Sequence, residues 1–556
     1  MAMMSGSRLF AEMLQGYGVS HIFFMPAILS KALAEMEDMP IKRILTHGEK
    51  AAVYMADGYA RASGKPGICM SQAIGASNLA AGLRDAYMAG SPVIAITGGP
   101  QIDWRYRNAY QEVEDFSQFD PVTKFNAHVD AVSRLPDLLR QAFRVATSGA
   151  PGPVHLQIHS RGGQITEQVA DLSPQTETTF SRVPAFRIEP TQQHITDVLN
   201  VLAKAKRPVI VAGNGVTRSG AEREVQEFAE LLQIPVITSL NAKATLPDQH
   251  PLAVGISGSY SRSCANRTLT EADLVFYIGS RAGGMVTHNW TYPPFNTQVI
   301  QLDIDPAELG RNYPNVASIV GDAKVTLRRL IDAAPHFSMK ERQVWTERVA
   351  NLVAAWRTDE EQNLSSDAIP MRPERICREI SQALPPDGVV VSDTGHSGIW
   401  SGTMIELRYP TQRFFRCAGS LGWGFPGAMG VKCALPDRPV LCFTGDGGFH
   451  YHTPELETAA RCGINLVVVV NNNGSLNQEI NLNKEAYNNK PRGGWTDMWT
   501  FKEVNFAKLA EVYGCVGIRV ETPTELKNAL EIAFTLNRPV VIDAVSDINA
   551  IAKRVH

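Results

Sequence analysis

Short, continuous apolar runs recur along the chain, and helical stretches lie between them. Runs that alternate with helices in this way are typical of parallel strands, which are buried on both faces of their sheet. The runs fall into three groups along the sequence: 21–25, 68–70, 93–97 and 154–158; then 208–212, 236–238, 274–278 and 298–302; then 388–392, 440–444, 465–471 and 539–544. The sequence therefore predicts an α/β protein with three doubly wound parallel-sheet domains.

The predicted domains span residues 1–165, 190–335 and 370–556. A polar stretch, 166–190, has few large apolar residues and is predicted to be a linker. A charged helical connector, 339–362, leads into the third domain. A chain of 556 residues fits this number, since one domain takes about 100–200 residues. The first and third segments could be copies of one architecture, although the sequence alone does not establish it.

Composition excludes several classes of protein. The net charge of −3 gives no general attraction to nucleic acid or to an anionic membrane. No apolar run reaches the ~20 residues of a membrane helix, and the N-terminus lacks the pattern of a signal peptide. The eight cysteines form no CxxC pair, which favours a reducing compartment over a disulfide scaffold. We expect a cytoplasmic protein with no nucleic-acid or membrane partner.

Two polar clusters follow neighbouring strand runs in the third segment. Gly-Asp-Gly-Gly, 445–448, ends one run, and Asn-Asn-Asn-Gly, 471–474, ends the next. Ligands of open α/β sheets bind at such carboxyl ends of strands. One carboxylate, one amide oxygen and backbone carbonyls suit Mg²⁺ or Ca²⁺ that bridges a diphosphate. An isolated Gly-Asp-Gly would be better explained as a turn with an Asp cap, but the second cluster favours a metal site.

The two clusters, with their spacing, resemble the Gly-Asp-Gly…Asn-Asn signature of thiamine-diphosphate enzymes. The resemblance implies Mg²⁺ ligands at Asp446, Asn473 and the carbonyl of Ser475. It also implies a cofactor cradle at Gly445, Gly447 and Gly448. Because three asparagines follow one another, the second ligand could also be the asparagine next to Asn473.

A second block, 49–61, resembles the family's Glu-x-x-Ala-x-x-x-Ala-x-Gly-Tyr-Ala-Arg sequence. In the family this glutamate bonds N1′ of the aminopyrimidine ring and so activates the cofactor. The resemblance therefore assigns that catalytic role to Glu49, whose carboxyl group should share a proton more readily in an apolar site. Taken alone, Glu49 could equally be a first-turn glutamate stabilised by the helix dipole.

Further loops resemble cofactor and substrate loops of the family. The loop 71–78 is similar to a pyrimidine-side loop, although Ala73-Ile74 replaces its Gly-Pro. The loop 393–400 is similar to one that touches the diphosphate, and 419–427 to one that wedges the cofactor into its bent shape. The alternative for the loop 393–400 is an ordinary polar loop that binds no ligand, and the alternative for Leu421 in 419–427 is a leucine of the hydrophobic core. The implied cofactor-binding residues are Ser71, Gly75, Asn78, Gly395, His396, Ser397 and Leu421; the implied substrate-pocket residues are Ala27, Gln72, Asn477 and Gln478.

The order of the segments matches the acetolactate synthase, pyruvate oxidase and benzaldehyde lyase group. The stretches 110–113 and 122–126 look like those of acetolactate synthases, which implies a catalytic Gln111 facing the active site of a partner subunit. The loop 24–30 is closer to that of 2-hydroxyacyl-CoA lyases. We expect acetolactate-synthase-like carboligation of 2-oxo acids. The alternative is a carbon–carbon lyase or decarboxylase acting on an acyloin-like or CoA substrate, and the retained Glu49 argues against a non-catalytic nucleotide-binding homologue.

Two glycine-rich loops of the second segment, 213–215 and 279–284, follow strand runs. They could hold FAD, the ADP part of CoA, or nothing, since a lone Gly-x-Gly is a weak signal. The resemblance also implies a homodimer as the minimum unit, and favours a homotetramer, because Glu49 and Asp446 would reach one cofactor from different subunits.

Overall fold

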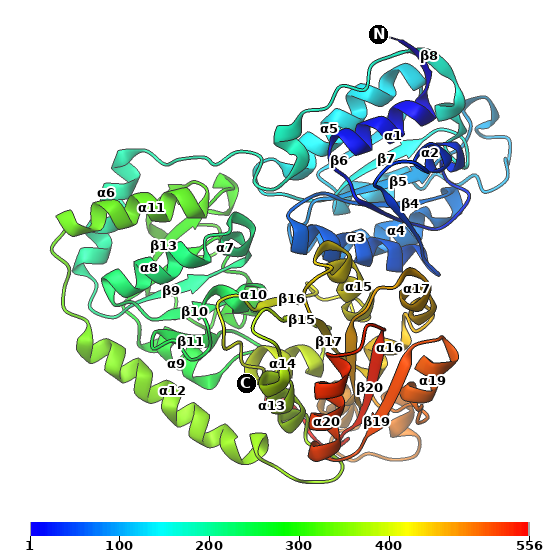
Figure 1. Cartoon of the computed structure of the whole chain (residues 1–556). Helices are drawn as coiled ribbons and strands as arrows, with labels where there is room; N and C mark the ends of the chain where they lie inside the picture. Colours follow the sequence, from blue (N-terminus) through cyan, green and yellow to red (C-terminus); the bar gives the residue numbers. More distant parts are fainter. Residues whose placement is uncertain (1, 554–556) are drawn as a thin grey trace.

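Three six-stranded parallel sheets organise the chain, with helices packed on both faces of each sheet (Figure 1). The computed structural model describes residues 2–553. The three domains follow one another along the sequence, and the N-terminal and C-terminal domains lie side by side. The prediction of an α/β protein with three parallel-sheet domains is confirmed.

The N-terminal sheet has the strand order β3-β2-β4-β5-β7-β6. Its strands are β2 (His21–Phe24), β3 (Lys42–Leu45), β4 (Gly67–Ser71), β5 (Val93–Gly98), β6 (Phe125–Val129) and β7 (Val154–Ile158). Its helices are α1 (Gly6–Gly16), α2 (Ser30–Glu35), α3 (Glu49–Ser63), α4 (Ala76–Met88) and α5 (Leu135–Thr147).

The central sheet has the order β11-β10-β9-β12-β13-β14. Its strands are β9 (Pro208–Ala212), β10 (Val236–Thr238), β11 (Ala253–Ile256), β12 (Leu274–Ile278), β13 (Gln298–Asp303) and β14 (Asn315–Val320). Its helices are α6 (Gln192–Lys204), α7 (Asn214–Ser219), α8 (Glu222–Leu232), α9 (Ser263–Glu271), α10 (Gly284–Thr287) and α11 (Ala323–Ala333). The long helix α12 (Gln343–Leu364) leads to the C-terminal domain, as the charged connector predicts.

The C-terminal sheet has the order β16-β15-β17-β18-β20-β19. Its strands are β15 (Val389–Ser392), β16 (Arg413–Arg416), β17 (Val440–Gly445), β18 (Val467–Asn472), β19 (Val516–Val520) and β20 (Val540–Val545). Its helices are α13 (Pro373–Ala383), α14 (His396–Met404), α15 (Gly424–Ala434), α16 (Asp446–His450), α17 (Glu455–Cys462), α18 (Ile480–Ala486), α19 (Phe506–Val512) and α20 (Pro523–Ala533).

The first and third sheets share one topology. When strands are numbered from the start of each sheet, both have the order 2-1-3-4-6-5, whereas the central sheet has the order 3-2-1-4-5-6. The central order is the one found in dinucleotide-binding folds. The outer domains are thus two versions of one architecture, which the sequence alone left open.

The stretch 166–190 differs from the predicted linker. Its residues Val169–Leu172 form β8, which pairs antiparallel with β1 (Ala2–Ser5). The Oγ atom of Ser7 on α1 also donates to the carbonyl of Thr166 at 3.3 Å. The first part of this stretch therefore packs on the N-terminal domain, and the polar pattern concealed a strand at the surface.

Helices α3 and α15 hold the N-terminal and C-terminal domains together. A Cβ atom built on Gly58 of α3 would lie 2.0 Å from the carbonyl oxygen of Gly427 on α15, and one on Gly430 would lie 1.9 Å from that of Met55. The two helix backbones therefore touch directly, as only glycine allows. One apolar cluster continues across this contact, from Ala52 on α3 to the strands of the C-terminal sheet.

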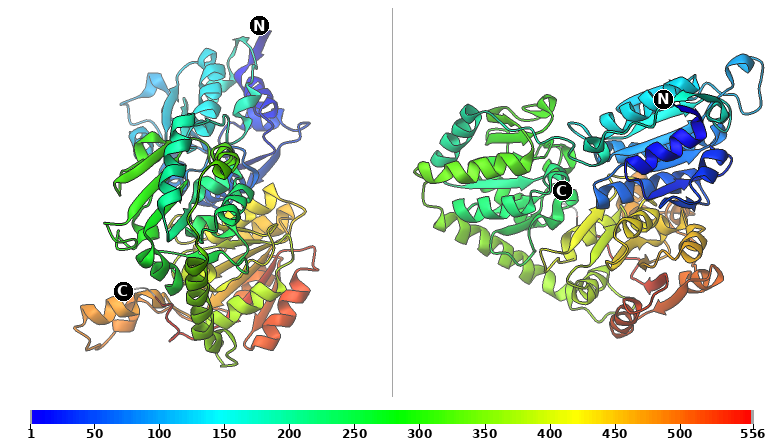
Figure 2. Two further views of the ribbon diagram at one scale, coloured as in Figure 1. Left: turned by 90° about the vertical axis from the view of Figure 1, so that its left-hand side faces the viewer. Right: turned by 45° about the horizontal axis from the view of Figure 1, so that its top comes forward.

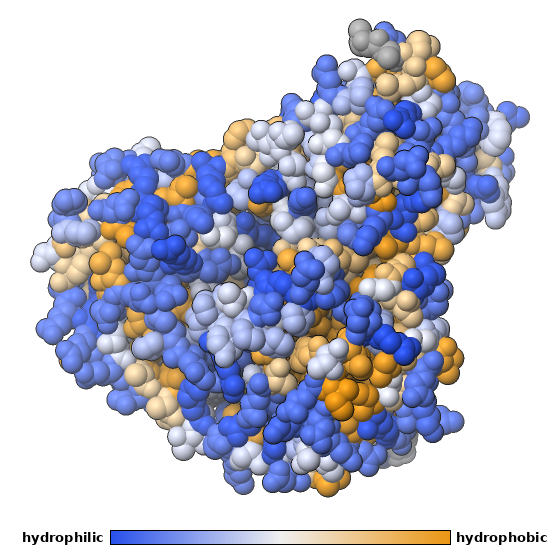
Figure 3. Space-filling model, viewed as in Figure 1, coloured by the Kyte–Doolittle hydropathy of each residue, from blue (hydrophilic) through white to orange (hydrophobic). Residues whose placement is uncertain are grey.

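Hydrophilic residues predominate on the face shown in Figure 3, and apolar residues gather at its lower right, over the C-terminal domain. Within residues 2–553, no helix combines the length and the apolar character that a membrane span requires.

Candidate active site

A cavity of about 320 Å³ opens at the carboxyl ends of β15, β17 and β18. It lies where the chain order of the sheet reverses, which is the usual ligand position in open α/β sheets. Every site residue predicted in the third segment lines it: Gly395, His396, Ser397, Leu421, Gly445, Asp446, Gly447, Gly448, Asn473, Ser475, Asn477 and Gln478. The two clusters at the strand ends and the loops that resemble family loops therefore line one cavity.

Asp446 and Asn473 present their oxygens side by side. The backbone N–H of Ser475 donates to Oδ2 of Asp446 at 3.0 Å and to Oδ1 of Asn473 at 3.1 Å. Burial raises the pKa of Asp446 to about 6, although backbone N–H groups, that of Gly447 among them, lower it. A buried carboxylate beside an amide oxygen is a donor set that suits a divalent cation.

The three consecutive asparagines have different surroundings. Asn472 points away from the cavity, since its Nδ2 donates to Oδ1 of Asp543 at 2.8 Å and to the carbonyl of Val504 at 3.0 Å. Asn471 and Asn473 both line the cavity. The Oδ1 of Asn471 is buried and accepts no hydrogen bond from the described residues. The arrangement supports Asn473 as the second ligand and adds Asn471, which the sequence analysis did not single out.

His396, at the start of α14, is held in place by Asn477. The Nδ2 of Asn477 donates to the carbonyls of Ile548 and Ala550, at 3.1 and 2.8 Å. Its Oδ1 therefore faces Nδ1 of His396 at 2.8 Å, so the histidine carries a proton on Nδ1. Asn477 thus positions His396 rather than reaching freely for a substrate.

The glycines of the motif make room for neighbouring groups. A Cβ on Gly447 would lie 2.5 Å from Cδ2 of Leu476, and one on Gly448 would lie 3.1 Å from the carboxyl carbon of Asp393. Asp393 is fully buried and accepts backbone N–H bonds from Gly422 and Gly424, yet burial raises its pKa to about 6. Asp393 ties the Leu421 loop to the end of β15.

Lining residues that the sequence analysis did not single out are Tyr260, Thr394, Gly419, Asn471 and Leu476. Most flank motif residues in sequence, so the motif itself could have indicated them. Tyr260 comes from the central domain, under the guanidinium of Arg416 at 5.5 Å, and carries no local signal.

The N-terminal domain brings a second group of predicted residues together. Asn78 donates to Oε2 of Glu49 at 3.0 Å. A Cβ on Gly75 would lie 2.7 Å from Cγ of Glu49 and 2.9 Å from Cβ of Ser71. Gly75 therefore lets the turn at 73–75 pack against the carboxylate. Glu49 is partly exposed within the described chain, so the apolar surroundings expected for it are not provided by this chain alone.

The remaining predicted residues lie on nearby loops of the same domain. Gln72 precedes the turn 73–75, and Ala27 lies on an exposed loop with a left-handed backbone, φ 64°. Gln111, φ 66°, lies on the long loop between β5 and β6, which projects from the domain (Figure 2). Its Oε1 is buried and accepts no hydrogen bond from residues 2–553.

The two groups stay apart within one chain. Among the described residues, the cavity around Asp446 is lined by the central and C-terminal domains alone, so Glu49 and Gln111 do not reach it. The loop of Gln111 instead exposes large apolar side chains, including Trp104 at 55%, Tyr106 at 85% and Tyr110 at 76%.

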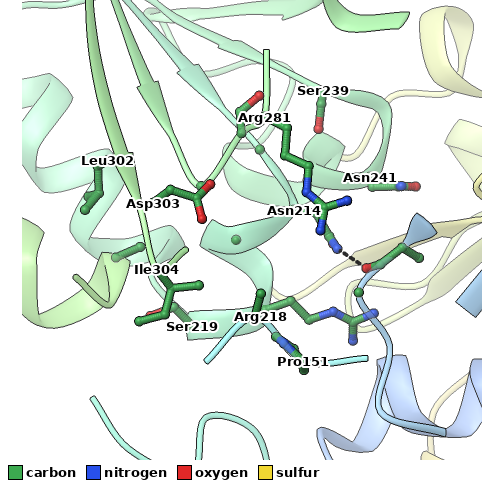
Figure 4. Close-up of a pocket in the computed structure, with 18 of the residues that line it drawn as sticks. Pro151, Asn214, Arg218, Ser219, Ser239, Asn241, Arg281, Leu302, Asp303 and Ile304 are labelled. Atoms are coloured by element: carbon green, nitrogen blue, oxygen red, sulfur yellow. Dashed lines mark hydrogen bonds between the residues drawn. The ribbon is translucent and has the colours of Figure 1, made fainter. Parts of the chain in front are cut away.

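A second cavity, of about 500 Å³, lies between the central and N-terminal domains. Figure 4 shows Arg218, Arg281 and Asp303 around it, and Asn214 donating to the carbonyl of Ala89 at 2.7 Å. Both glycine-rich loops line it. A Cβ on Gly213 would lie 2.2 Å from the carbonyl oxygen of Gly279, so these glycines first serve the packing of one loop on the other.

The comparisons with known proteins match this arrangement. Residues 4–119 match the thiamine pyrophosphate enzyme N-terminal TPP binding domain, 195–330 the central domain, and 393–544 the C-terminal TPP binding domain. The chain belongs to the thiamine pyrophosphate enzyme family. The family's two TPP-binding domains are those that contain Glu49 and Asp446.

Curated relatives of this thiamine pyrophosphate enzyme cover nearly its whole length. The probable acetolactate synthase large subunit of Methanocaldococcus jannaschii is 33% identical over 98% of this chain and 92% of its own. The acetolactate synthase large subunit of Lactococcus lactis is 31% identical, over 97% and 92%. The acetolactate synthase isozyme 3 large subunit of Escherichia coli is 29% identical, over 98% and 96%. The resemblance to the acetolactate synthase group is confirmed.

Proposed function

We propose that this protein is a thiamine-diphosphate- and Mg²⁺-dependent carboligase that joins 2-oxo acids, in the manner of an acetolactate synthase. The observation that carries the proposal is the cavity where the Asp446 and Asn473 oxygens converge on one backbone N–H of Ser475. The names of the relatives support the synthase, and none of those described above is a lyase. A carbon–carbon lyase has no comparable support.

The residues present fit the cofactor and its metal. Asp446, Asn473 and the carbonyl of Ser475 would hold Mg²⁺, whose charge would offset the buried carboxylate. Gly445, Gly447 and Gly448 begin a helix whose N-terminal N–H groups favour a diphosphate. Thiamine diphosphate, when bound, supplies the nucleophilic carbon and the electron sink.

Side chains of this protein would position the cofactor and the substrate and would transfer protons. Glu49, oriented by Asn78, can hold or return a proton at its carboxylate. His396 can donate to phosphate oxygens through Nε2 once its ring carries a second proton, because Nδ1–H is already directed to Asn477. Ser397, Leu421, Ser71 and Gly75 would frame the cofactor, and Ala27, Gln72, Gln111 and Gln478 would shape the substrate pocket.

We further propose that the active unit is a homodimer, with two such dimers forming a tetramer. Glu49 and the Asp446 cavity do not meet in one chain, and the Gln111 loop exposes apolar side chains that a second copy would bury. A dimer that pairs the N-terminal domain of one chain with the C-terminal domain of the other would complete two equivalent sites.

A direct assay tests the chemistry. The protein is incubated with thiamine diphosphate, Mg²⁺ and pyruvate, and acetolactate is sought by mass spectrometry. We expect acetolactate, and we expect Glu49→Gln to bind the cofactor without turnover. Release of an aldehyde from an acyloin, with no ligation, would favour the lyase. Full turnover by Glu49→Gln would overturn the role of Glu49.

Mixing two inactive variants tests the dimer. In a hybrid of Glu49→Gln with Asp446→Asn chains, one site lacks both groups and the other is intact. Random exchange of subunits makes about half of the dimers hybrids, so about a quarter of the sites should recover. If both groups act within one chain, mixing restores nothing. Each variant alone is the control.

The cavity between the central and N-terminal domains favours a nucleotide such as FAD or an ADP moiety. Its sheet has the dinucleotide-binding order, and the buried Nε of Arg218 bonds to none of the described residues. Burial lowers the pKa of Arg218 to about 10, which an anionic ligand would offset. Flavin absorbance of the purified protein, or saturable ADP binding lost in Arg218→Met, would support this. The absence of both signals would refute the nucleotide proposal.

A further inference from the structure

A cluster of three metal-ligating side chains lies in the N-terminal domain, away from the site of Asp446. His128 belongs to β6, Asp130 follows β6, and His159 follows β7. One ligand atom from each lies within 4.8 Å of the other two. Because the two strands are parallel neighbours, their carboxyl ends bring these residues to one edge of the sheet.

The hydrogen bonds of His159 leave a conflict that a cation would resolve. Its Nδ1 faces the carbonyl oxygen of Pro100 at 2.8 Å. A carbonyl can only accept, so Nδ1 carries the proton and Nε2 of the neutral ring has a lone pair. That Nε2 faces the carboxylate of Asp130, a second acceptor. The contact therefore needs a second proton, on the ring or on the carboxyl group, or a cation for which Asp130 moves aside to make room.

The Pro100 contact is the arrangement that metal-bound histidines show. Such a histidine almost always donates its other N–H to a carbonyl or carboxylate, which fixes the orientation of the ring. His128 adds a further signal. Its Nδ1 is buried and forms no hydrogen bond with any residue that the structure describes. Its ring is fixed by stacking on Phe116, with centroids 3.7 Å apart.

We propose that His128, Asp130 and His159 bind a first-row transition-metal ion of the Zn²⁺ class. Two imidazoles and one carboxylate are ligands of Zn²⁺ rather than of Mg²⁺, which prefers oxygen. Three protein ligands leave a fourth position for water.

Small side-chain rotations would complete the geometry. Bonds of ~2.0–2.1 Å around a tetrahedral ion place ligand atoms roughly 3.3 Å apart, whereas here Asp130 and His159 are in direct contact and no pair of ligand atoms lies more than 4.8 Å apart. The side chain of Asp130 is 61% exposed and therefore has space to rotate. The backbone of the two histidines stays fixed by the strands. The positive charge of Arg105, which acts electrostatically on His128, opposes the ion.

The bound ion would also steady the loop that carries Gln111. Pro100 begins this loop, and Gly99 donates its N–H to the carbonyl of Ser160, next to His159. Fixing the ring of His159 would fix the Pro100 carbonyl, and so the start of the loop. This consequence can be measured without any assay of turnover.

Metal binding to the full chain tests the proposal. The Asp446→Asn variant is used, in excess Mg²⁺, so that the diphosphate site does not capture the probe. Zn²⁺ is measured by equilibrium dialysis, and Co²⁺ by its visible absorption bands. We expect one ion per chain, at least tenfold weaker binding in His128→Ala, Asp130→Asn and His159→Ala, and an unchanged result in the control His336→Ala, on the surface of the central domain.

Two further outcomes sharpen the result. Arg105→Gln should tighten Zn²⁺ binding, because it removes the opposing charge. Zn²⁺ should slow amide exchange in the loop 99–115 of the Asp446→Asn protein and not in its His159→Ala derivative. No bound ion, or equal binding by the His128→Ala/His159→Ala double variant, would overturn the proposal and leave a protonated His159 paired with Asp130. Metal binding and amide exchange are both measured without the carboligase activity, so a failure of this proposal can be told apart from a failure of the proposed function.

Discussion

Arg61 is the charged centre of the contact between the N-terminal and C-terminal domains, and its removal should open that contact. Its guanidinium is 4% exposed and pairs with Asp57 at 2.5 Å and Asp85 at 2.8 Å, both from its own domain. Its Nη1 donates across the interface to the carbonyl of Arg416 at 2.6 Å. Arg61→Leu would leave the buried carboxylates of Asp57 and Asp85 without the cation that pairs with them.

The magnitude follows from the burial of the three groups. Removing one partner of a buried pair costs about 3–5 kcal/mol, because the remaining charge stays desolvated. Since every 1.4 kcal/mol is tenfold in population, opening of the contact should become roughly two to four orders of magnitude more frequent. Hydrogen exchange of amides in α3 and α15 measures this opening directly, without assuming that a chain of several domains unfolds in one step.

The pH dependence of the effect has a definite sign. Burial would raise the pKa of Asp85, but Arg61 and the backbone N–H groups of Ala418 and Ser420 hold it below the usual value. A depressed carboxyl pKa contributes stability that is present above the unfolded pKa and lost as the pH falls through the folded pKa. In Arg61→Leu this contribution is absent, so the difference from the parent protein should shrink on acidification.

Arg134→Leu is the matched control. Arg134 pairs with Asp137 at 2.9 Å, but both side chains are exposed, at 61% and 42%, and this substitution should leave exchange unchanged. Exchange in Arg61→Leu that equals the control, at neutral pH, would refute the role of buried charge at this contact.

The remaining predictions concern close packing and the neighbouring asparagines. Gly58→Ala should lower the melting temperature, although Ala ordinarily favours a helix by about 1 kcal/mol, because its Cβ would lie 2.0 Å from the oxygen of Gly427; unchanged melting would contradict the contact. Asn472→Ala should lower the melting temperature by removing a buried bond to Asp543, with the Mg²⁺ requirement unchanged. Asn473→Ala should leave the melting temperature unchanged and raise the Mg²⁺ concentration needed for cofactor binding at least tenfold. If instead Asn472→Ala raised the Mg²⁺ requirement and Asn473→Ala lowered the melting temperature, the roles assigned to the two asparagines would be exchanged.

How far the sequence predicts this fold depends on where a strand lies in its sheet. Each of the three predicted groups corresponds to the four interior strands of one sheet, and every strand at a sheet edge was missed. Interior strands such as β12 are buried throughout, so they give continuous apolar runs. Edge strands such as β14 and β19 alternate or stay half-buried, and their pattern does not differ from that of a loop.

The residues of the candidate site also differ in how well the sequence predicts them, because only some of them directly follow interior strands. Asp446 and Asn473 follow interior strands, so their meeting could be inferred from topology. Within the block around Glu49, several matching residues serve the domain contact instead, including Gly58 against α15 and Arg61 against the backbone of Arg416. Tyr260 reaches the cavity from another domain and leaves no pattern in the sequence.

The shared topology of the outer domains explains why the two halves of the site lie apart in one chain. Glu49, the turn at 73–75 and the loop of Gln111 all lie at the carboxyl ends of the N-terminal sheet, as Asp446 does in the C-terminal sheet. The contact that joins the two sheets within a chain uses the helices α3 and α15, on a face of each sheet rather than at its strand ends. Two ligand-binding edges that a chain cannot bring together can still meet through a second copy, related by a twofold axis.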